Sequence, residues 1–195
     1  LANVVAGTIH GASPYGVFDR VVNDLDVPAT SFKATDLIIV ANPIKTSDGL
    51  HSFKRVVQIS EVRKHWQKDP LEEKGFVDLM KYNVETDQLE PTDDLINGDS
   101  EIIKDVASNV KGWAGNWDAV WDNILLRAKI KEEIVNVAEK TKNSKLLESE
   151  FNTLSNYAFH KISDEVRQEI GLPLSEKVFP LWKKWLDDEI RKMEF

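Results

Sequence analysis

Near the start of the chain, apolar positions cluster in short continuous runs. Residues 3–9 and 37–41 are such runs, and a run of this length is typical of a strand buried on both faces of a sheet. Residues 53–62 alternate instead, with Val57 and Ile59 apolar and polar residues between them. The pattern therefore predicts three strands within residues 1–66. Because the first run opens the chain, we expect it to belong to a larger sheet whose other strands precede it.

Between the first two runs, apolar residues recur at helical spacing. Ser13 can cap this helix, and Pro14 suits its first position, where a missing N–H costs nothing. The expected apolar face consists of Val17, Phe18, Val21, Val22 and Leu25. We expect Asn42 and Pro43 to end the second strand and residues 46–49 to form a turn.

After residue 66 the pattern changes. Residues 67–75 are a charged linker. A β-hairpin is predicted next: its first strand covers residues 76–82, its turn residues 84–87, and its second strand begins at Leu89. Helical spacing begins at Ser100.

The helical pattern predicts five helices. The first covers residues 102–110, the third lies around residues 147–158, and the last covers residues 181–193. Ser163 is the expected cap of a short fourth helix that stops at Gly171. The second helix, capped by Asn116, has an expected apolar face of Trp117, Val120, Trp121, Ile124, Leu125, Ala128 and Val135. Since no basic residues interleave its tryptophans, they predict helix packing and not a base-stacking platform.

Composition narrows the class of protein. The chain has 195 residues, of which 42% are apolar and 30% charged, as expected of a soluble globular protein. It has no apolar run long enough to predict a membrane span and no pattern of a secretory signal. The absence of cysteine excludes disulfides, thiolate metal sites and cysteine nucleophiles, which fits a cytosolic protein.

The net charge of −8 is unevenly distributed. Residues 1–66 carry seven Lys and Arg against six Asp and Glu, whereas residues 67–195 carry eighteen against twenty-seven. Neutralising nucleic-acid phosphates requires clustered basic residues. We therefore expect no nucleic-acid partner.

Candidate chemistry centres on one of the four histidines. No metal-binding histidine pair, G-x-S-x-G elbow, G-x-G-x-x-G loop or G-x-x-x-x-G-K-[ST] loop occurs. His10, however, lies where a predicted strand ends and a helix begins, and ligands of open α/β sheets gather beyond such strand ends. Its imidazole can bond a phosphate or a water, or it can be a structural histidine.

The residues around His10 resemble a known motif. Residues 6–13 read AGTIHGAS, and residues 18–22 read FDRVV. This stretch resembles the histidine box of the type II/type IV secretion ATPases, the hexameric motors of type II secretion, type IV pili, archaella and conjugation. The box has the form G-T-x-H, followed by small residues and a serine, and then by a helix with an arginine. Ser13 and Arg20 stand at the matching positions.

Later segments are similar to the same family. Residues 35–40 (TDLIIV) and 55–62 (RVVQISEV) resemble the two core strands that follow the box. Residues 81–87 (KYNVETD) are similar to the K-Y-x-x-x-T-D hairpin of the archaeal branch, and residues 126–130 (LRAKI) resemble its R-A-x-x-L helix. The resemblance extends from residue 1 to about residue 140.

The resemblance implies a fold. Residues 1–66 would be the C-terminal half of a RecA-like P-loop ATPase core, an α/β fold that carries the histidine box. Residues 67–96 would be a linker and β-hairpin, and residues 97–195 an α-helical C-terminal region. We expect the helical region to fold when cut free, and residues 1–66 not to.

The resemblance also implies a function. The parent protein would hydrolyse ATP to drive protein secretion or the assembly of type IV pilus-like filaments. It would be cytoplasmic and peripheral at the inner face of the membrane. Its partners would be the N-terminal part of the same motor, neighbouring subunits of a homo-oligomer, expected to be a hexamer, and a membrane platform protein.

Residue roles follow from the same resemblance. His10 would bond the γ-phosphate or the attacking water, with Thr8 in support. Arg20 would hold the box or face a neighbouring subunit, and Arg55 and Arg63 are further interface candidates. All three arginines also have a purely structural interpretation.

The sequence departs from the family in one respect. The family's phosphate loop and acidic box precede the histidine box, and only nine residues precede His10 here. We therefore expect ATP and Mg²⁺ to be held by the rest of the motor, and this chain alone neither to bind nor to hydrolyse ATP.

Two other functions stay open. A non-enzymatic interaction module of the same family would bind other subunits or a membrane platform. A small hydrolase using His10 with Asp19 or Asp24 would need a nucleophile, which the sequence does not identify.

Overall fold

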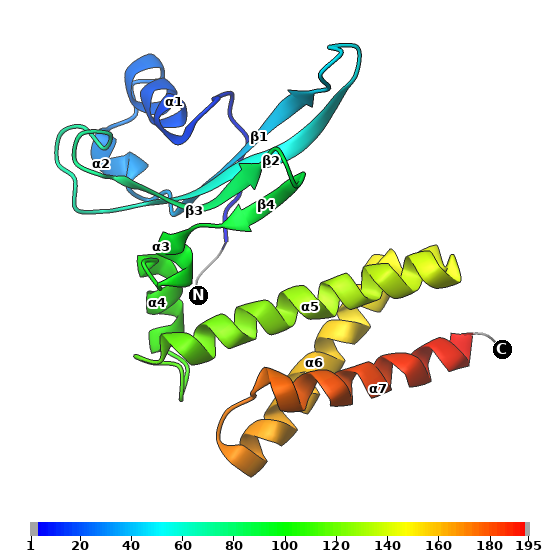
Figure 1. Ribbon diagram of the computed structural model, residues 1–195. Coiled ribbons are helices and arrows are strands. Elements are labelled where there is room, and N and C mark those ends of the chain that lie inside the picture. Colours follow the sequence, from blue (N-terminus) through cyan, green and yellow to red (C-terminus); the bar gives the residue numbers. More distant parts are fainter. Residues whose placement is uncertain (1–3, 194–195) are drawn as a thin grey trace. The chain divides into compact units, whose positions relative to one another are not determined.

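The computed structural model describes residues 4–193, and the chain divides into two compact units. The first unit ends at Asp105 and the second begins at Val106 (Figure 1). The hairpin that follows residue 75 belongs to the sheet of the first unit, so strand pairing continues well past residue 66.

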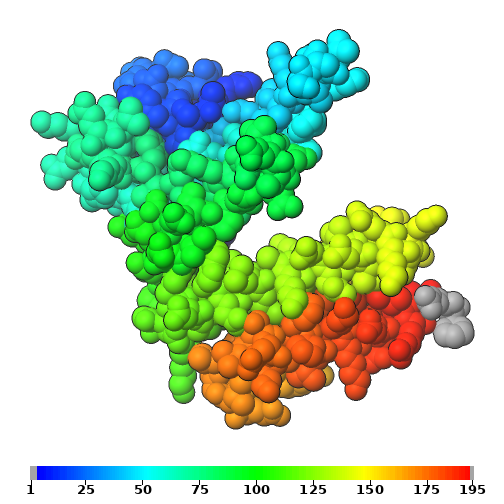
Figure 2. Space-filling view, in the orientation of Figure 1, coloured from blue at the N-terminus to red at the C-terminus, as the bar shows by residue number. Residues whose placement is uncertain are grey.

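Four antiparallel strands form the sheet of the first unit, in the order β1-β2-β3-β4. They are β1 (Leu37–Lys45), β2 (Ser52–Val62), β3 (Phe76–Asn83) and β4 (Gln88–Pro91). The expected combination of helices and strands is confirmed, and so is the hairpin of β3 and β4. The turn between β1 and β2 is also confirmed; the amide of Gly49 donates to the carbonyl of Thr46 at 2.9 Å, and Figure 2 shows this turn projecting from the unit.

The second predicted strand differs from expectation in two ways. β1 is buried on one face only, because Ile38 and Val40 are buried while Leu37 and Ile39 are exposed. It also continues through Pro43 to Lys45. Proline removes one ladder donor, which an edge strand tolerates, and β1 lies at an edge of the sheet.

The strand predicted over residues 3–9 is not formed. Asn3 lies outside the described residues, and residues 4–9 have no regular secondary structure. Val4 and Val5 are 97% and 90% exposed. A strand needs a neighbour for its N–H and C=O groups, and no strand of residues 4–193 pairs with this segment.

Short helices cover one face of the sheet. They are α1 (Pro14–Asp19), the π-helix η1 (Arg20–Asp24) and α2 (Ala29–Phe32). The predicted cap is confirmed, since Ser13 Oγ accepts the amide of Gly16 at 3.0 Å. Phe18 packs edge-on against both Phe32 and Trp66. These rings form a core with buried residues of β1 and β2, namely Ile38, Val40 and Val62.

The π-helix changes which residues face that core. The amide of Leu25 donates to the carbonyl of Arg20, five residues earlier. This wider turn rotates the following side chains relative to an α-helix. Leu25, predicted on the apolar face, is consequently 58% exposed.

Two further helices follow the sheet: α3 (Asp93–Ile96) and α4 (Glu101–Ser108). Thr92 caps α3. α4 is the first of the helices predicted from Ser100 onward.

The second unit is built from three long helices. They are α5 (Trp117–Thr141), α6 (Ser149–Ile170) and α7 (Ser175–Met193), with the 3₁₀ turn η2 (Ser144–Leu147) between α5 and α6. The Asn116 cap of α5 is confirmed by the amide of Ala119 donating to its Oδ1 at 3.2 Å. The core residues of the three helices include Leu126, Ile130, Phe159, Val178, Trp182 and Leu186.

Two predictions about these helices are wrong. Ser163 does not begin a new helix but lies buried within α6, which continues to Ile170 and ends at Gly171 with a φ of +88°. On α5, Leu125, Ala128 and Val135 are exposed although all three were expected on the packing face. The bundle instead buries a different stripe of α5, made of Val120, Asn123, Leu126, Ile130, Ile134 and Ala138.

Candidate functional site

The segment that carries His10 is fixed at its C-terminal end by α1. A Cβ on Gly11 would come within 2.7 Å of Val17 Cγ2 and 3.2 Å of the Val17 amide nitrogen. Only glycine therefore allows the segment to lie this close to the helix. Ser13 then caps α1, with Pro14 at the first helical position. Gly11 and Ser13, two of the three small residues that follow the histidine, thus each have a structural reason.

The side chains of Thr8 and His10 are exposed. Arg20 is also exposed and begins η1. Within residues 4–193, no hydrogen bond or ion pair joins Thr8, His10 and Arg20. The structure therefore leaves the imidazole of His10 accessible to a ligand, and it does not bring the predicted site residues into one cluster.

Arg55 lies on β2 and is held by the β3–β4 hairpin. Its Nε donates to Asp87 Oδ1 at 2.8 Å and its Nη2 to Asp87 Oδ2 at 2.7 Å. Tyr82 Oη donates to the same Asp87 Oδ1 at 2.6 Å. The guanidinium also lies over the ring of Phe53, 4.4 Å from its centre. In the K-Y-x-x-x-T-D segment, Asp87 thus holds Arg55, and Tyr82 holds Asp87.

The Asp87 carboxylate is stabilised by both donors. The hydrogen bonds from Arg55 and Tyr82 lower the pKa of Asp87 from its ordinary value of 3.8 to about 2. The hydrogen bond to Asp87 correspondingly raises the pKa of Arg55 and of Tyr82.

The Asp87 pKa gives a pH-dependent prediction. A depressed folded-state pKa contributes stability above the unfolded-state value, and that contribution is lost as pH falls from about 4 to about 2. Carboxyl NMR should show Asp87 titrating near 2 in the wild type. Arg55→Gln should move this pKa up toward 3.8, whereas Lys54→Gln should leave it unchanged. A wild-type Asp87 that titrates at its ordinary pKa would contradict the hydrogen-bonded geometry.

Arg63 lies just beyond the end of β2 and is buried. Its Nη2 donates to the Asp99 carbonyl at 2.8 Å and to Asp99 Oδ1 at 2.9 Å. Its Nη1 lies 3.3 Å from Glu61 Oε1 and 3.0 Å from Glu101 Oε1. Burial opposes the charge, but Glu61 and then Asp99 and Glu101 outweigh it, so the pKa of Arg63 is raised.

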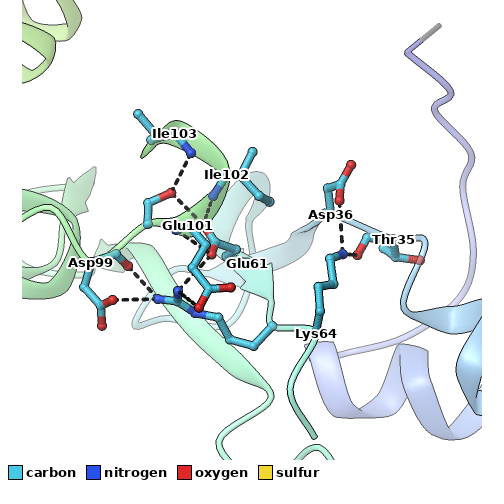
Figure 3. Close-up of polar contacts among 10 residues, drawn as sticks. Thr35, Asp36, Glu61, Lys64, Asp99, Glu101, Ile102 and Ile103 are labelled. Atoms are coloured by element: carbon cyan, nitrogen blue, oxygen red, sulfur yellow. Dashed lines mark hydrogen bonds and ion pairs between the residues drawn. The ribbon is translucent and has the colours of Figure 1, made fainter. Parts of the chain in front are cut away.

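Glu61 is the buried centre of this network (Figure 3). Its Oε2 accepts Ser100 Oγ at 2.5 Å and the Ile102 amide at 3.4 Å, and its Oε1 accepts the Glu101 amide at 2.9 Å. These amides belong to the first turn of α4, whose unpaired N–H groups favour a carboxylate. Glu61 therefore ties β2 to the start of α4, and Arg63 balances its charge.

Sequence reasoning missed Glu61, Ser100 and Asp99. Glu61 stands between Ser60 and Val62 in a strand, where alternation gives no sign that a carboxylate is buried. Its partners lie about forty residues later in the chain. Asp87, by contrast, is the last residue of the segment KYNVETD, which resembles the K-Y-x-x-x-T-D hairpin. That resemblance is a sequence signal that could have identified Asp87 as a site residue.

The other histidines do not form a site. His51 is exposed beside the β1–β2 turn, and His65 Nε2 lies 2.8 Å from the Glu73 carbonyl oxygen. His160 packs edge-on against Phe159. Within residues 4–193, no group of three His, Asp or Glu side chains could hold a metal ion. No helix in that part of the chain is both long and apolar enough to cross a membrane.

Comparison with known proteins adds no family. No protein-family model matches the chain, and no curated protein matches it with significant sequence similarity.

Proposed function

We propose that this chain is the C-terminal portion of an ATP-hydrolysing motor that drives protein secretion or the assembly of type IV pilus-like filaments. The observation that carries the proposal is the segment of residues 6–13. It combines the histidine-box pattern with an exposed Thr8 and His10, held by a glycine-dependent approach to a capped helix. In this proposal residues 1–66 belong to a RecA-like core, and the segment before His10 joins that core as a strand.

Within the motor, His10 bonds the γ-phosphate or the attacking water, and Thr8 supports it. Of the three candidate arginines, Arg20 is the best placed for contact with a neighbouring subunit, because its side chain is exposed. Arg55 and Arg63 are weaker candidates, since Asp87 holds Arg55 and three carboxylates surround Arg63. The motor would act in the cytoplasm at the inner face of the membrane, beside a platform protein.

ATP and Mg²⁺ are assigned to the remainder of the motor. The chain has no G-x-x-x-x-G-K-[ST] loop, whose backbone N–H groups and lysine would hold the phosphates. The proposal requires the rest of the motor to supply this loop, so a parent protein without a G-x-x-x-x-G-K-[ST] loop would contradict it.

The decisive experiment uses the motor that includes this chain. His10→Ala should lower kcat for ATP hydrolysis by roughly 10–1000-fold with ATP affinity nearly unchanged, because the bond to the reacting group is made mainly in the transition state. His51→Ala removes an exposed imidazole far along the sequence and should leave kcat unchanged. Equal rates for wild type and His10→Ala would return His10 to a structural role.

A second candidate is a non-enzymatic interaction module. The side chains of Val4 and Val5 favour this candidate, because both are apolar and almost fully exposed to solvent, and a protein partner that covered them would bury this apolar surface. Upstream sequence without a phosphate loop, together with no ATP hydrolysis, would favour the module.

A further inference from the structure

The helix α5 carries two separate apolar stripes. One is buried in the bundle and includes Leu126, Ile130 and Ile134. The other lies about 110° around the helix, at the 100° per residue of an α-helix. It consists of Trp117, Trp121, Ile124, Ala128 and Val135, with Lys131 between the last two. We call these six positions the α5 seam.

The bundle leaves the α5 seam accessible. Ala128 and Lys131 are exposed, and Val135 is 42% exposed. Trp117 and Trp121 stack on each other with ring centres 6.4 Å apart and are only partly buried. Leu125, which borders the seam, is 50% exposed. Apolar side chains therefore line this face for about 27 Å at a rise of 1.5 Å per residue.

The spacing of the α5 seam identifies the shape of its occupant. Its positions alternate by four and three residues, the repeat with which one helix packs side chains into holes of another. A strand or an irregular peptide would not need this repeat. The seam thus fits a second helix that crosses α5 at a shallow angle of about 20°.

We propose that the α5 seam pairs antiparallel with the α5 seam of a second copy of this chain. The reason is that the seam is self-complementary about residue 126. An antiparallel pair centred there places Trp117 against Val135 of the second copy and Ile124 against Ala128 of the second copy. Each such layer joins a large side chain to a smaller one, so the two helices can interdigitate.

The remaining layer matches charge to an aromatic ring. Trp121 meets Lys131 of the second copy, and an ammonium over an indole face is an attractive contact. Lys131 is thus a suitable member of the seam in this pairing, although a lysine interrupts an otherwise apolar stripe. The neighbouring Lys129 cannot serve, since it already lies over the Phe179 ring, 4.0 Å from its centre.

One flank of the pair carries like charges. Asp118 of one copy faces Glu132 of the other, and both are exposed. Repulsion between exposed charges is weak and is screened by salt. Association should therefore strengthen between low and physiological ionic strength.

Sedimentation velocity over a range of concentrations tests the pairing. The wild-type chain should show a reversible monomer–dimer equilibrium. Ala128→Lys places a charge against Ile124 of the second copy and should weaken dimerisation by about tenfold or more. Asn136→Lys adds the same charge at an exposed position outside the seam and should leave the equilibrium unchanged. Circular dichroism of each variant reports whether the helices stay folded.

Cross-linking tests the antiparallel direction. The chain has no cysteine, so a single Leu125→Cys provides a unique thiol close to the expected twofold axis. A short bismaleimide should link two such chains, whereas Asn136→Cys should not be linked. A monomeric wild type, a dimer unaffected by Ala128→Lys, or equal cross-linking at both positions would each overturn the proposal.

Discussion

Replacing Glu61 with alanine should destabilise the first unit by about 3–5 kcal/mol, the range found when one partner of a buried ion pair is removed. Glu61 is fully buried and accepts the Ser100 hydroxyl and the amides of Glu101 and Ile102. Its loss leaves these donors unpaired at the start of α4. It also leaves the buried Arg63 with two partners that are themselves exposed.

Hydrogen exchange of the full chain can locate this effect. The amides of Glu101 and Ile102 should lose most of their protection in Glu61→Ala, because they lose their acceptor. Glu101→Ala is the matched control: it removes an exposed carboxylate from the same arginine and should cost about 1 kcal/mol or less. Glu61→Gln keeps the shape of the side chain but has one acceptor oxygen in place of two and carries no charge, so its cost should fall between those of the other two variants. Equal costs for Glu61→Ala and Glu101→Ala would show that the network is not centred on Glu61.

Replacing Trp182 with alanine should destabilise the helical bundle by about 3–5 kcal/mol. Trp182 is fully buried in the core of the second unit. Its ring lies 6.1 Å from the rings of both Phe179 and Trp185, centre to centre. Removing the indole would leave a cavity that three long helices cannot close without losing other contacts.

Two variants make this prediction specific. Leu181→Ala, at a neighbouring position that is about half exposed, should change stability by about 0.5 kcal/mol or less. Trp182→Phe should cost much less than Trp182→Ala, because Trp182 Nε1 has no hydrogen-bond partner within residues 4–193 and phenylalanine removes that buried donor. Urea unfolding followed by far-ultraviolet circular dichroism measures all three. A Leu181→Ala variant as unstable as Trp182→Ala would contradict the assigned core.

Local patterns located most helices and strands. The Ser13 and Asn116 caps stand where the sequence placed them. The hairpin also turns at the expected residues between β3 and β4. Each of these sequence patterns involves only a few neighbouring residues, because the hydrogen bonds of a helix cap or a hairpin turn form between residues that are close in the chain.

The errors arose where the outcome depended on distant residues. The apolar run of residues 3–9 has strand composition, but no described strand pairs with it. Ser163 suits a cap by composition, yet it lies inside α6 and is buried. α5 has apolar residues on two faces, and periodicity alone could not show which face the bundle buries.

The candidate site was predictable only in part. The sequence identified His10 through its surrounding pattern, and the structure adds the contact of Gly11 with Val17 that explains one of the small residues. The roles of Arg55 and Arg63 within the fold were not predictable. Their carboxylate partners Asp87 and Asp99 lie 32 and 36 residues away in the sequence.

The sequence by itself determined the Ser13 and Asn116 helix caps, the two β-turns, the mixed helix and strand content and the pattern around His10, because these depend on neighbouring residues. Only the tertiary structure decided the antiparallel order of the strands, the burial of Glu61 and the face of α5 that packs. Burial is a property of what surrounds a residue in space. A carboxylate such as Glu61 is stable inside the protein only because Ser100, two helix amides and Arg63 meet it there.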